Sequence, residues 1–319
     1  TVSHQTLTSL TTSGSGGSVV GGNASNSILT INLASGTSTF SGTLGGGGTN
    51  ENRLSLTKAG AGTLLLTASD NSYSGLTNVI DSGVLDVGTI SSGALSANSG
   101  LLLGSSVVSS GNYGILQGNG SFTRSLSSNT TPGANQVAGA AGGFAARGGE
   151  LVVNFGGAGA QIGLNQSLAI FGNNFIFGST TADSKVVLVN SINLNSGSPN
   201  STRTFTVRAG IGGADATSAE LRGVVSNSPG FDNGIKMEGD GMLILSATNT
   251  YTGPTIVNGG TVQIGAGGTT GSIAAAGTIT VANGAILAFN RSDALTIGNA
   301  ITGAGSVLQV GGGTALLTN

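Results

Sequence analysis

Few residues of this 319-residue chain carry groups that could do chemistry. Charged side chains make up 7% of it, cysteine is absent, and the one histidine is His4. Without cysteine there can be no disulfide, thiolate zinc site or cysteine nucleophile. A lone histidine in a polar stretch near the first residue is a poor general base. The net charge of −2 provides no basic surface, so we expect no nucleic-acid partner.

The densest acidic group, in residues 231–240, is the best candidate for a metal site. Asp232, Glu238 and Asp240 could offer oxygen ligands to calcium. Their spacing fits neither the EF-hand loop nor the Gly-Gly-x-Gly-x-Asp repeat of calcium-binding β-rolls. A solvated turn, in which Lys236 pairs with a nearby carboxylate, is the simpler interpretation. We therefore expect no metal ion and no cofactor.

Enzymes that cut acidic polysaccharides need clustered carboxylates with a basic residue beside them. Two groups qualify by composition: Asp183 with Lys185, and Asp215 with Glu220 and Arg222. Both fall in loops of a segment whose basic and acidic residues balance. A site in a stacked fold can be assembled across windings of the chain. A polysaccharide-processing enzyme therefore stays open as an alternative.

The elements that would position these residues are short β-strands. Segments of about five residues, apolar at alternate positions or rich in β-branched residues, are bounded by Gly, Ser or Asn; examples are 27–33, 53–57, 185–189 and 278–281. The 59 glycines penalise long helices. The Ala-rich stretch 134–147 is interrupted by glycine, so we expect a loop there, with a helical turn or two at most. The chain is predicted to be all-β with essentially no helix.

One segment occurs twice and starts a third time. Residues 58–75 and 236–253 share a lysine, spaced glycines, alternating leucines and a Tyr-x-Gly ending, and residues 313–319 begin another copy. We interpret both tyrosines as corner or ladder residues with their hydroxyls at the rim. The predicted structural residues are Lys58, Gly60, Gly62, Leu64, Leu66, Tyr73 and Gly75 in the first copy, and Lys236, Gly239, Gly241, Leu243, Leu245, Asn249, Tyr251 and Gly253 in the second.

A repeated strand this short cannot bury its inner face alone, so the copies must stack. Parallel stacking at about 4.8 Å gives every strand a partner above and below. The resulting fold is a right-handed parallel β-helix, or β-solenoid, and we predict a single one over residues 1–319. Its predicted parts are N-terminal coils (1–57), the first copy (58–88), central coils with longer loops (89–235), the second copy (236–265), and C-terminal coils ending in a partial repeat (266–319).

The repeated pattern, Lys-x-Gly-x-Gly-Thr-Leu-x-Leu-x-x-x-Asn-x-Tyr-x-Gly-x-Thr-x-Val, resembles the autotransporter-associated β-strand repeat. The second copy matches it best, from Lys236 through Asn249 and Tyr251 to Thr255 and Val257. The resemblance implies a bacterial extracellular β-helix, either an autotransporter passenger or a surface-anchored exoprotein. It implies a repeat associated with export and with folding outside the cell, and it brings no catalytic residues.

These observations predict a non-enzymatic structural or adhesive β-solenoid, located extracellularly or on the bacterial cell surface. Residues 315–319 form an apolar repeat strand rather than a polar cap, which favours self-association, end to end or laterally, into a fibre, filament or layer. The hydroxyl- and amide-rich surface makes surface carbohydrate a second candidate partner. No apolar run is long enough for a membrane-spanning segment. A stalk that exports or displays another domain is the remaining alternative.

Overall fold

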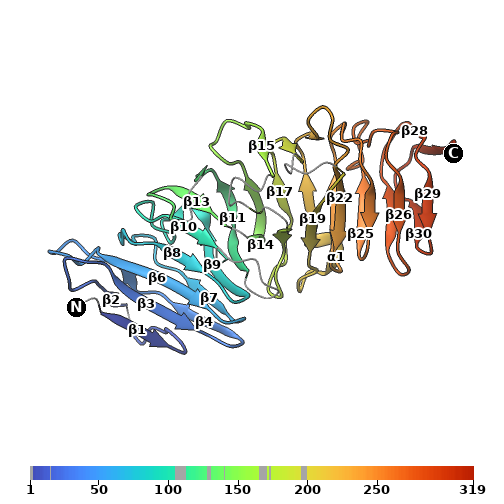
Figure 1. The fold of residues 1–319 in the computed structure, drawn as a ribbon. Coiled ribbons are helices and arrows are strands. Elements are labelled where there is room, and N and C mark those ends of the chain that lie inside the picture. Colours follow the sequence, from blue (N-terminus) through green and yellow to red (C-terminus); the bar gives the residue numbers. More distant parts are fainter. Residues whose placement is uncertain are drawn as a thin grey trace.

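The structure is a computed structural model, and it describes residues 3–14, 16–104, 113–127, 131–139, 141–164, 171, 174–194 and 200–319. The chain winds into an elongated rod whose two termini lie at opposite ends (Figure 1). Every pairing between its named strands is parallel. The predicted parallel β-helix is thereby confirmed.

The N-terminal half carries two long faces. Strands of the first face stack in one sheet: β1 (His4–Leu7), β3 (Ser27–Asn32), β6 (Leu54–Ala59), β8 (Thr77–Val79), β10 (Leu101–Leu103) and β13 (Gln136–Ala138), with β12 (Ser125–Leu126) at its edge. Strands of the second face follow them along the chain: β4 (Thr37–Phe40), β7 (Thr63–Leu66), β9 (Gly83–Thr89), β11 (Gly114–Phe122) and β14 (Gly142–Val153).

The second face divides in two at β14. The first part of β14 pairs with one ladder: β16 (Asn174–Phe177), β19 (Thr202–Val207), β22 (Gly234–Glu238), β24 (Thr255–Val257), β26 (Ile279–Val281) and β29 (Ile301–Gly303). Its last residues pair with another: β17 (Val186–Leu188), β20 (Ala219–Leu221), β23 (Met242–Leu245), β25 (Thr261–Ile264), β27 (Ile286–Phe289) and β30 (Ser306–Gln309). Among the described strands no pairing joins β4 to β29 or β30, so the ladder does not close on itself.

Short strands mark the third side of the rod. They are β2 (Ser18–Val19), β5 (Thr43–Leu44), β15 (Ile162–Gly163), β18 (Ile192–Asn193), β21 (Val225–Ser226), β28 (Ala294–Ile297) and β31 (Thr314–Leu317). Two short helical elements occur in the described residues, η1 (Ile90–Ser92) and α1 (Gly213–Ala216). The content is therefore nearly all β, as predicted.

The division at β14 turns the second repeat copy relative to the first. The strand that opens the first copy, β6, lies on the first face. Its counterpart in the second copy, β22, stacks through β19, β16 and β14 onto β11 and β9, which belong to the second face. The two copies are thus rotated by one face about the rod. In Figure 1 the strands of the blue half run across the view, whereas those of the orange half run vertically.

The expectation of a loop over residues 134–147 is wrong. This stretch contains β13 and the first part of β14, the longest strand of the described chain, with 12 residues. Its small residues are the reason, because Ala145 and Ala146 are fully buried between neighbouring strands where a larger side chain would not fit. Burial in a packed sheet outweighs the weak strand propensity of Gly and Ala.

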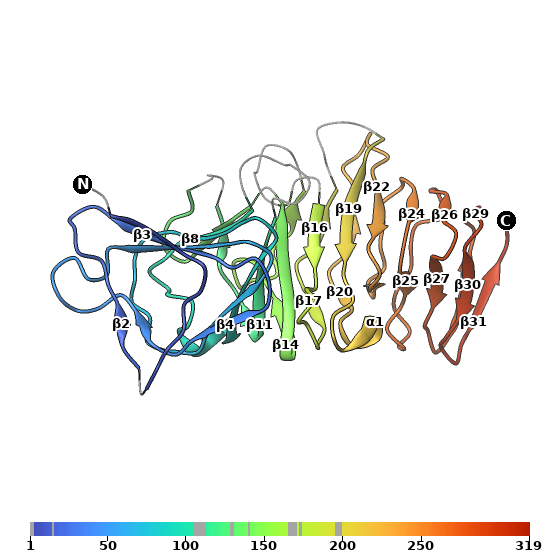
Figure 2. The ribbon, with the colours of Figure 1, turned by 90° about the horizontal axis from the view of Figure 1, so that it is seen from below.

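The core is continuous and becomes aromatic at the junction of the two halves. Phe171 stacks on Phe175 with ring centroids 4.4 Å apart, and Phe175 stacks on Phe177 at 4.5 Å. Phe144 of β14 and Phe122 of β11 extend this cluster, and the centroids of these two rings lie 4.9 Å apart. These rings belong to the buried core. The strands that carry four of them, β11, β14 and β16, lie near the middle of the rod (Figure 2).

Candidate functional site

The repeat motif holds neighbouring coils together through a buried asparagine. In the second copy, Asn249 accepts the backbone N–H of Val225 from the preceding coil at 2.8 Å and donates to the carbonyl of Ser272 in the next coil at 2.9 Å. In the first copy, Asn71 does the same between Leu44 at 2.6 Å and Ala94 at 2.8 Å. One side chain therefore joins three successive coils. The sequence analysis included Asn249 but missed Asn71, although both stand two residues before the repeat tyrosine.

The repeat tyrosines lie inside the coils, so the interpretation of their hydroxyls as rim groups is wrong. Tyr73 and Tyr251 are fully buried, and each shares a hydrogen bond of 2.7 Å with a threonine four residues later, Thr77 or Thr255. Burial raises the pKa of both phenols, which keeps them neutral hydrogen-bonding groups. A large ring with one satisfied polar end fills the corner of the coil.

The repeat glycines permit close approach between coils. Gly60 and Gly239 both adopt positive φ, at 73° and 93°. A Cβ at Gly239 would lie 2.2 Å from the carbonyl oxygen of Val207 in the preceding coil, and one at Gly60 would lie 2.5 Å from that of Leu33. Any side chain would both strain the backbone and push two coils apart.

The two repeat lysines are not structural equivalents. Lys58 pairs with Val79, and the residue that pairs with the corresponding Val257 is Met237. Lys58 therefore points into the core, where its ammonium donates to the carbonyls of Ala59 and Gly60, each at 2.6 Å. Burial lowers the pKa of Lys58 to about 8, against a smaller opposing effect of Asp81.

Lys236, one residue before the buried position, points outward. It forms an ion pair of 2.8 Å with Glu238, as the interpretation of a solvated turn expected. The second copy has one more residue between the lysine and the first repeat glycine than the first copy has. The two lysines still align as a sequence pattern, but in a strand a shift of one residue moves the side chain to the opposite face.

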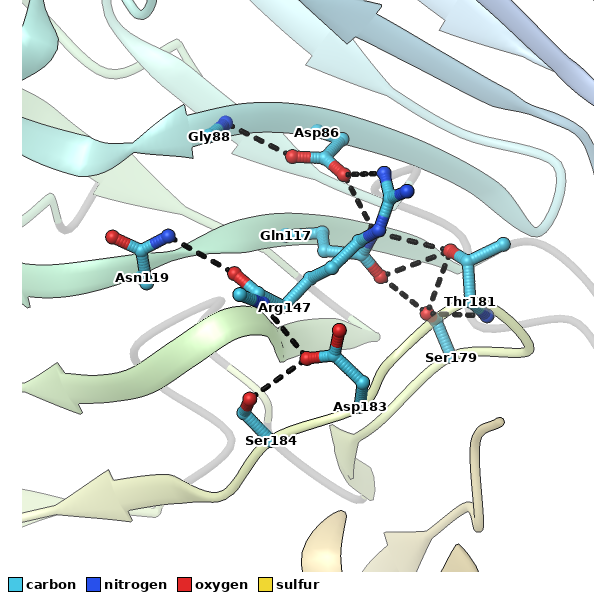
Figure 3. A network of polar contacts seen from close by, with 10 residues as sticks. Asp86, Gly88, Gln117, Asn119, Arg147, Ser179, Thr181, Asp183 and Ser184 are labelled. Atoms are coloured by element: carbon cyan, nitrogen blue, oxygen red, sulfur yellow. Dashed lines mark hydrogen bonds and ion pairs between the residues drawn. The ribbon is translucent and has the colours of Figure 1, made fainter. Parts of the chain in front are cut away.

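A polar network on the outer face marks the place where the sheet divides (Figure 3). Asp86 of β9 is almost fully buried and accepts from Gln117 of β11 at 2.8 Å and from Arg147 of β14 at 3.0 Å. Gln117 in turn contacts Ser179 and Thr181 of the segment after β16. Four coils are thus connected by side chains at the junction.

The segment 178–184, here called the strap, crosses this outer face. Ala182 packs with apolar residues of β9, β11, β14 and β16 in a cluster separate from the core. Asp183 accepts the backbone N–H of Gly148 at 2.7 Å, and Ser184 accepts that of Gly149 at 3.0 Å. Sequence reasoning missed the strap and Asp86, because a Gly-, Ser- and Thr-rich loop shows no periodicity.

The candidate catalytic residues do not group in the structure as the sequence suggested. Asp183 belongs to the strap, whereas Lys185 pairs with Glu220 at 2.8 Å and with Glu150 at 3.4 Å. Glu220 also accepts from Arg222 and Ser246. These hydrogen bonds outweigh the desolvation of Glu220 and lower its pKa to about 2. Such a carboxylate is a poor proton donor at neutral pH.

Asp215 is not part of this group. It lies on α1, beside the outer surface of β23 and β25, and no hydrogen bond or ion pair between Asp215 and Glu220 occurs in the described part of the chain.

The three candidate metal ligands have separate partners. Asp232 accepts from Thr252 at 2.7 Å, Glu238 pairs with Lys236, and Asp240 accepts the backbone N–H of Ala209 at 3.0 Å. No group of three or more His, Cys, Asp or Glu side chains within the described ranges is arranged to hold a metal ion. His4 lies exposed on β1, the outermost strand of the first face.

None of the helices that the described residues form has both the length and the apolar character that crossing a membrane requires.

Comparisons with known proteins identify the repeats. Residues 56–87 and 237–264 match the passenger-associated-transport-repeat family. A stretch of 95 residues is 39% identical to a protein of Brucella suis biovar 1 (strain 1330) named adhesin BmaC autotransporter; it covers 30% of this chain and 3% of that protein. No solved structure matches the chain. The chain thus carries two passenger-associated-transport repeats, which confirms the resemblance to autotransporter passenger repeat proteins and the predicted extracellular or cell-surface location.

Proposed function

We propose that this chain is a non-enzymatic, adhesive part of an extracellular passenger rod. The observation that carries the proposal is the 39% identity, over 95 residues, to a protein named as an adhesin. The repeat side chains support it, because Asn71, Asn249, Tyr73 and Tyr251 are all engaged in contacts between or within coils. The repeat motif stabilises the rod, so the residues available to bind a target surface are the outward side chains and the turns.

The experiment is an adhesion assay with the purified chain coupled to microspheres. Coated spheres should be retained on epithelial monolayers, and spheres carrying the heat-unfolded chain should wash off. Equal retention of both would contradict an adhesive function of the folded rod.

The non-enzymatic part is tested separately, by incubating the chain with acidic polysaccharides in the presence of calcium and assaying new reducing or unsaturated ends. We expect none. Turnover that disappears in the Glu220→Gln variant would replace the adhesive proposal by the enzymatic one.

A further inference from the structure

One buried arginine has no carboxylate partner. Arg124, which is 6% exposed, donates to the backbone carbonyls of Ser99 at 2.6 Å and Ser96 at 2.7 Å, with a longer contact of 3.4 Å to Leu95. No ion pair with Arg124 is present among the described residues, and the remaining segments of the sequence contain no Asp or Glu.

An arginine stays protonated even when burial lowers its pKa, as it does here. Three neutral carbonyls satisfy hydrogen bonds but leave a full positive charge uncompensated. Removing a charge from water without a counter-charge is costly, so such a group attracts an anion. Its surroundings decide which anion could reach it.

Arg124 forms part of the wall of a cleft of about 390 Å³ beside β11 and η1. The cleft also presents the exposed amides of Asn98 and Asn135 and the hydroxyl of Thr123, with Ile90 as an apolar wall. Its volume is at the small end of the range for sites that bind small molecules. Amides and hydroxyls suit the hydroxyls of a sugar, and an apolar wall suits the C–H face of its ring.

We propose that this cleft binds a carboxylated sugar unit of an acidic glycan, with its carboxylate at Arg124. The amides of Asn98 and Asn135 then bind ring hydroxyls. The choice of a glycan rests on the proposed adhesive function, since surface glycans are what an extracellular rod meets. The charge argument does not depend on it.

The test is an NMR titration of the whole chain with methyl glucuronide. Binding is monitored through shifts of the backbone amide resonances of Asn98, Thr123 and Asn135. Methyl glucoside, which lacks the carboxylate, is the matched ligand control. We expect saturable shifts with the glucuronide and at least tenfold weaker binding of the glucoside, because a hydrogen-bonded charge pair is worth more than a neutral contact. Equal binding of the two sugars, or no shift with either, would overturn the proposal.

Two variants separate binding from folding. Arg124→Gln should weaken glucuronide binding at least tenfold, and Asn98→Asp, at an exposed position, should do the same by adding a negative charge to the wall. Arg53→Gln, at an exposed arginine outside the cleft, is the control and should bind normally. Unchanged binding in Asn98→Asp contradicts the site even where Arg124→Gln fails to fold. Cell adhesion without glucuronide binding refutes the cleft alone, and glucuronide binding without cell adhesion refutes the adhesive function alone.

Discussion

Lys58 places an ammonium in the core of the coil that opens the first repeat. Its pKa of about 8 in the folded chain lies below the value of 10.5 for a lysine in water. Between these two values the unfolded chain binds more protons than the folded one, so the free energy of unfolding rises with pH in that window. The full cost of the buried charge is present below about pH 8.

Lys58→Met introduces the residue that stands at the equivalent position of the second copy. The free energy of unfolding of the variant should not rise between pH 7 and pH 10 as that of the wild type does. The difference in this free energy between the two chains should therefore change by about 2 to 3 kcal/mol from pH 7 to pH 10. Urea unfolding at both pH values measures this. Lys236→Met, at the outward lysine, is the control and should follow the wild type. Parallel pH profiles for Lys58→Met and the wild type would show that the ammonium is solvated.

The folded pKa of Glu220, about 2, also lies below its usual 4.5, so the free energy of unfolding again rises with pH, here because folding favours the charged form. The stabilisation it contributes is complete above pH 4.5 and is lost as the pH falls towards 2. Glu220→Gln should therefore lower the free energy of unfolding by about 2 kcal/mol at pH 7 and converge with the wild type near pH 2. Glu238→Gln, at the more exposed ion pair, should change it by less than about 1 kcal/mol. An equal loss at pH 3 and pH 7 would contradict the ionic origin of the effect.

At the scale of elements, the strap covers the outer face where the sheet divides. Its contacts to Gln117 come from the hydroxyls of Ser179 and Thr181. Replacing both, by Ser179→Ala and Thr181→Val, should release the strap, because the buried amide of Gln117 then lacks these partners. Hydrogen exchange of the amides in 179–184 should accelerate at least tenfold, with the amides of β23 unchanged. Thr180→Ala, at an exposed threonine between them, is the control; the same acceleration there would assign the effect to the loop itself.

Strand alternation predicted most of the individual elements, and the reason is visible in the repeat. Leu64, Leu66, Leu243 and Leu245 are all fully or almost fully buried, because alternate residues of a strand share one face. The same reasoning failed at β14, where Gly and Ala carry no alternation and burial alone decides. The repeat pattern alone gave no orientation for Lys58, because the side of the strand on which it lies depends on the register.

At the scale of the whole molecule, the repeated sequence predicted that the coils stack. It did not predict that the second copy is rotated by one face relative to the first. That rotation depends on β14, whose first residues pair with β16 and whose last residues pair with β17. β11 and β14 are 9 and 12 residues long, and they pack against the strap and the aromatic cluster. These contacts join residues up to 64 positions apart, as between Gln117 and Thr181. Neither a local pattern nor the similarity of the two copies contains that information.

Register along the rod can be tested by removing one whole coil. Met242 pairs with Thr261, so deletion of residues 242–260 places β25 where β23 was, with Val262 and Ile264 in the inward places of Leu243 and Leu245. In this part of the rod each strand pairs with the strands of the neighbouring coils, so this shortened chain should fold and unfold cooperatively with modestly reduced stability. Circular dichroism and thermal unfolding measure both.

Deletion of residues 242–261, one residue longer, is the matched control. It moves Val262 to an outward position and Gln263 to an inward one, so that every side chain of the strand faces the wrong way. This chain should fail to unfold cooperatively or should aggregate. If both deletions were equally stable, the strands would not be held in the parallel register on which the rod and its outward surfaces depend.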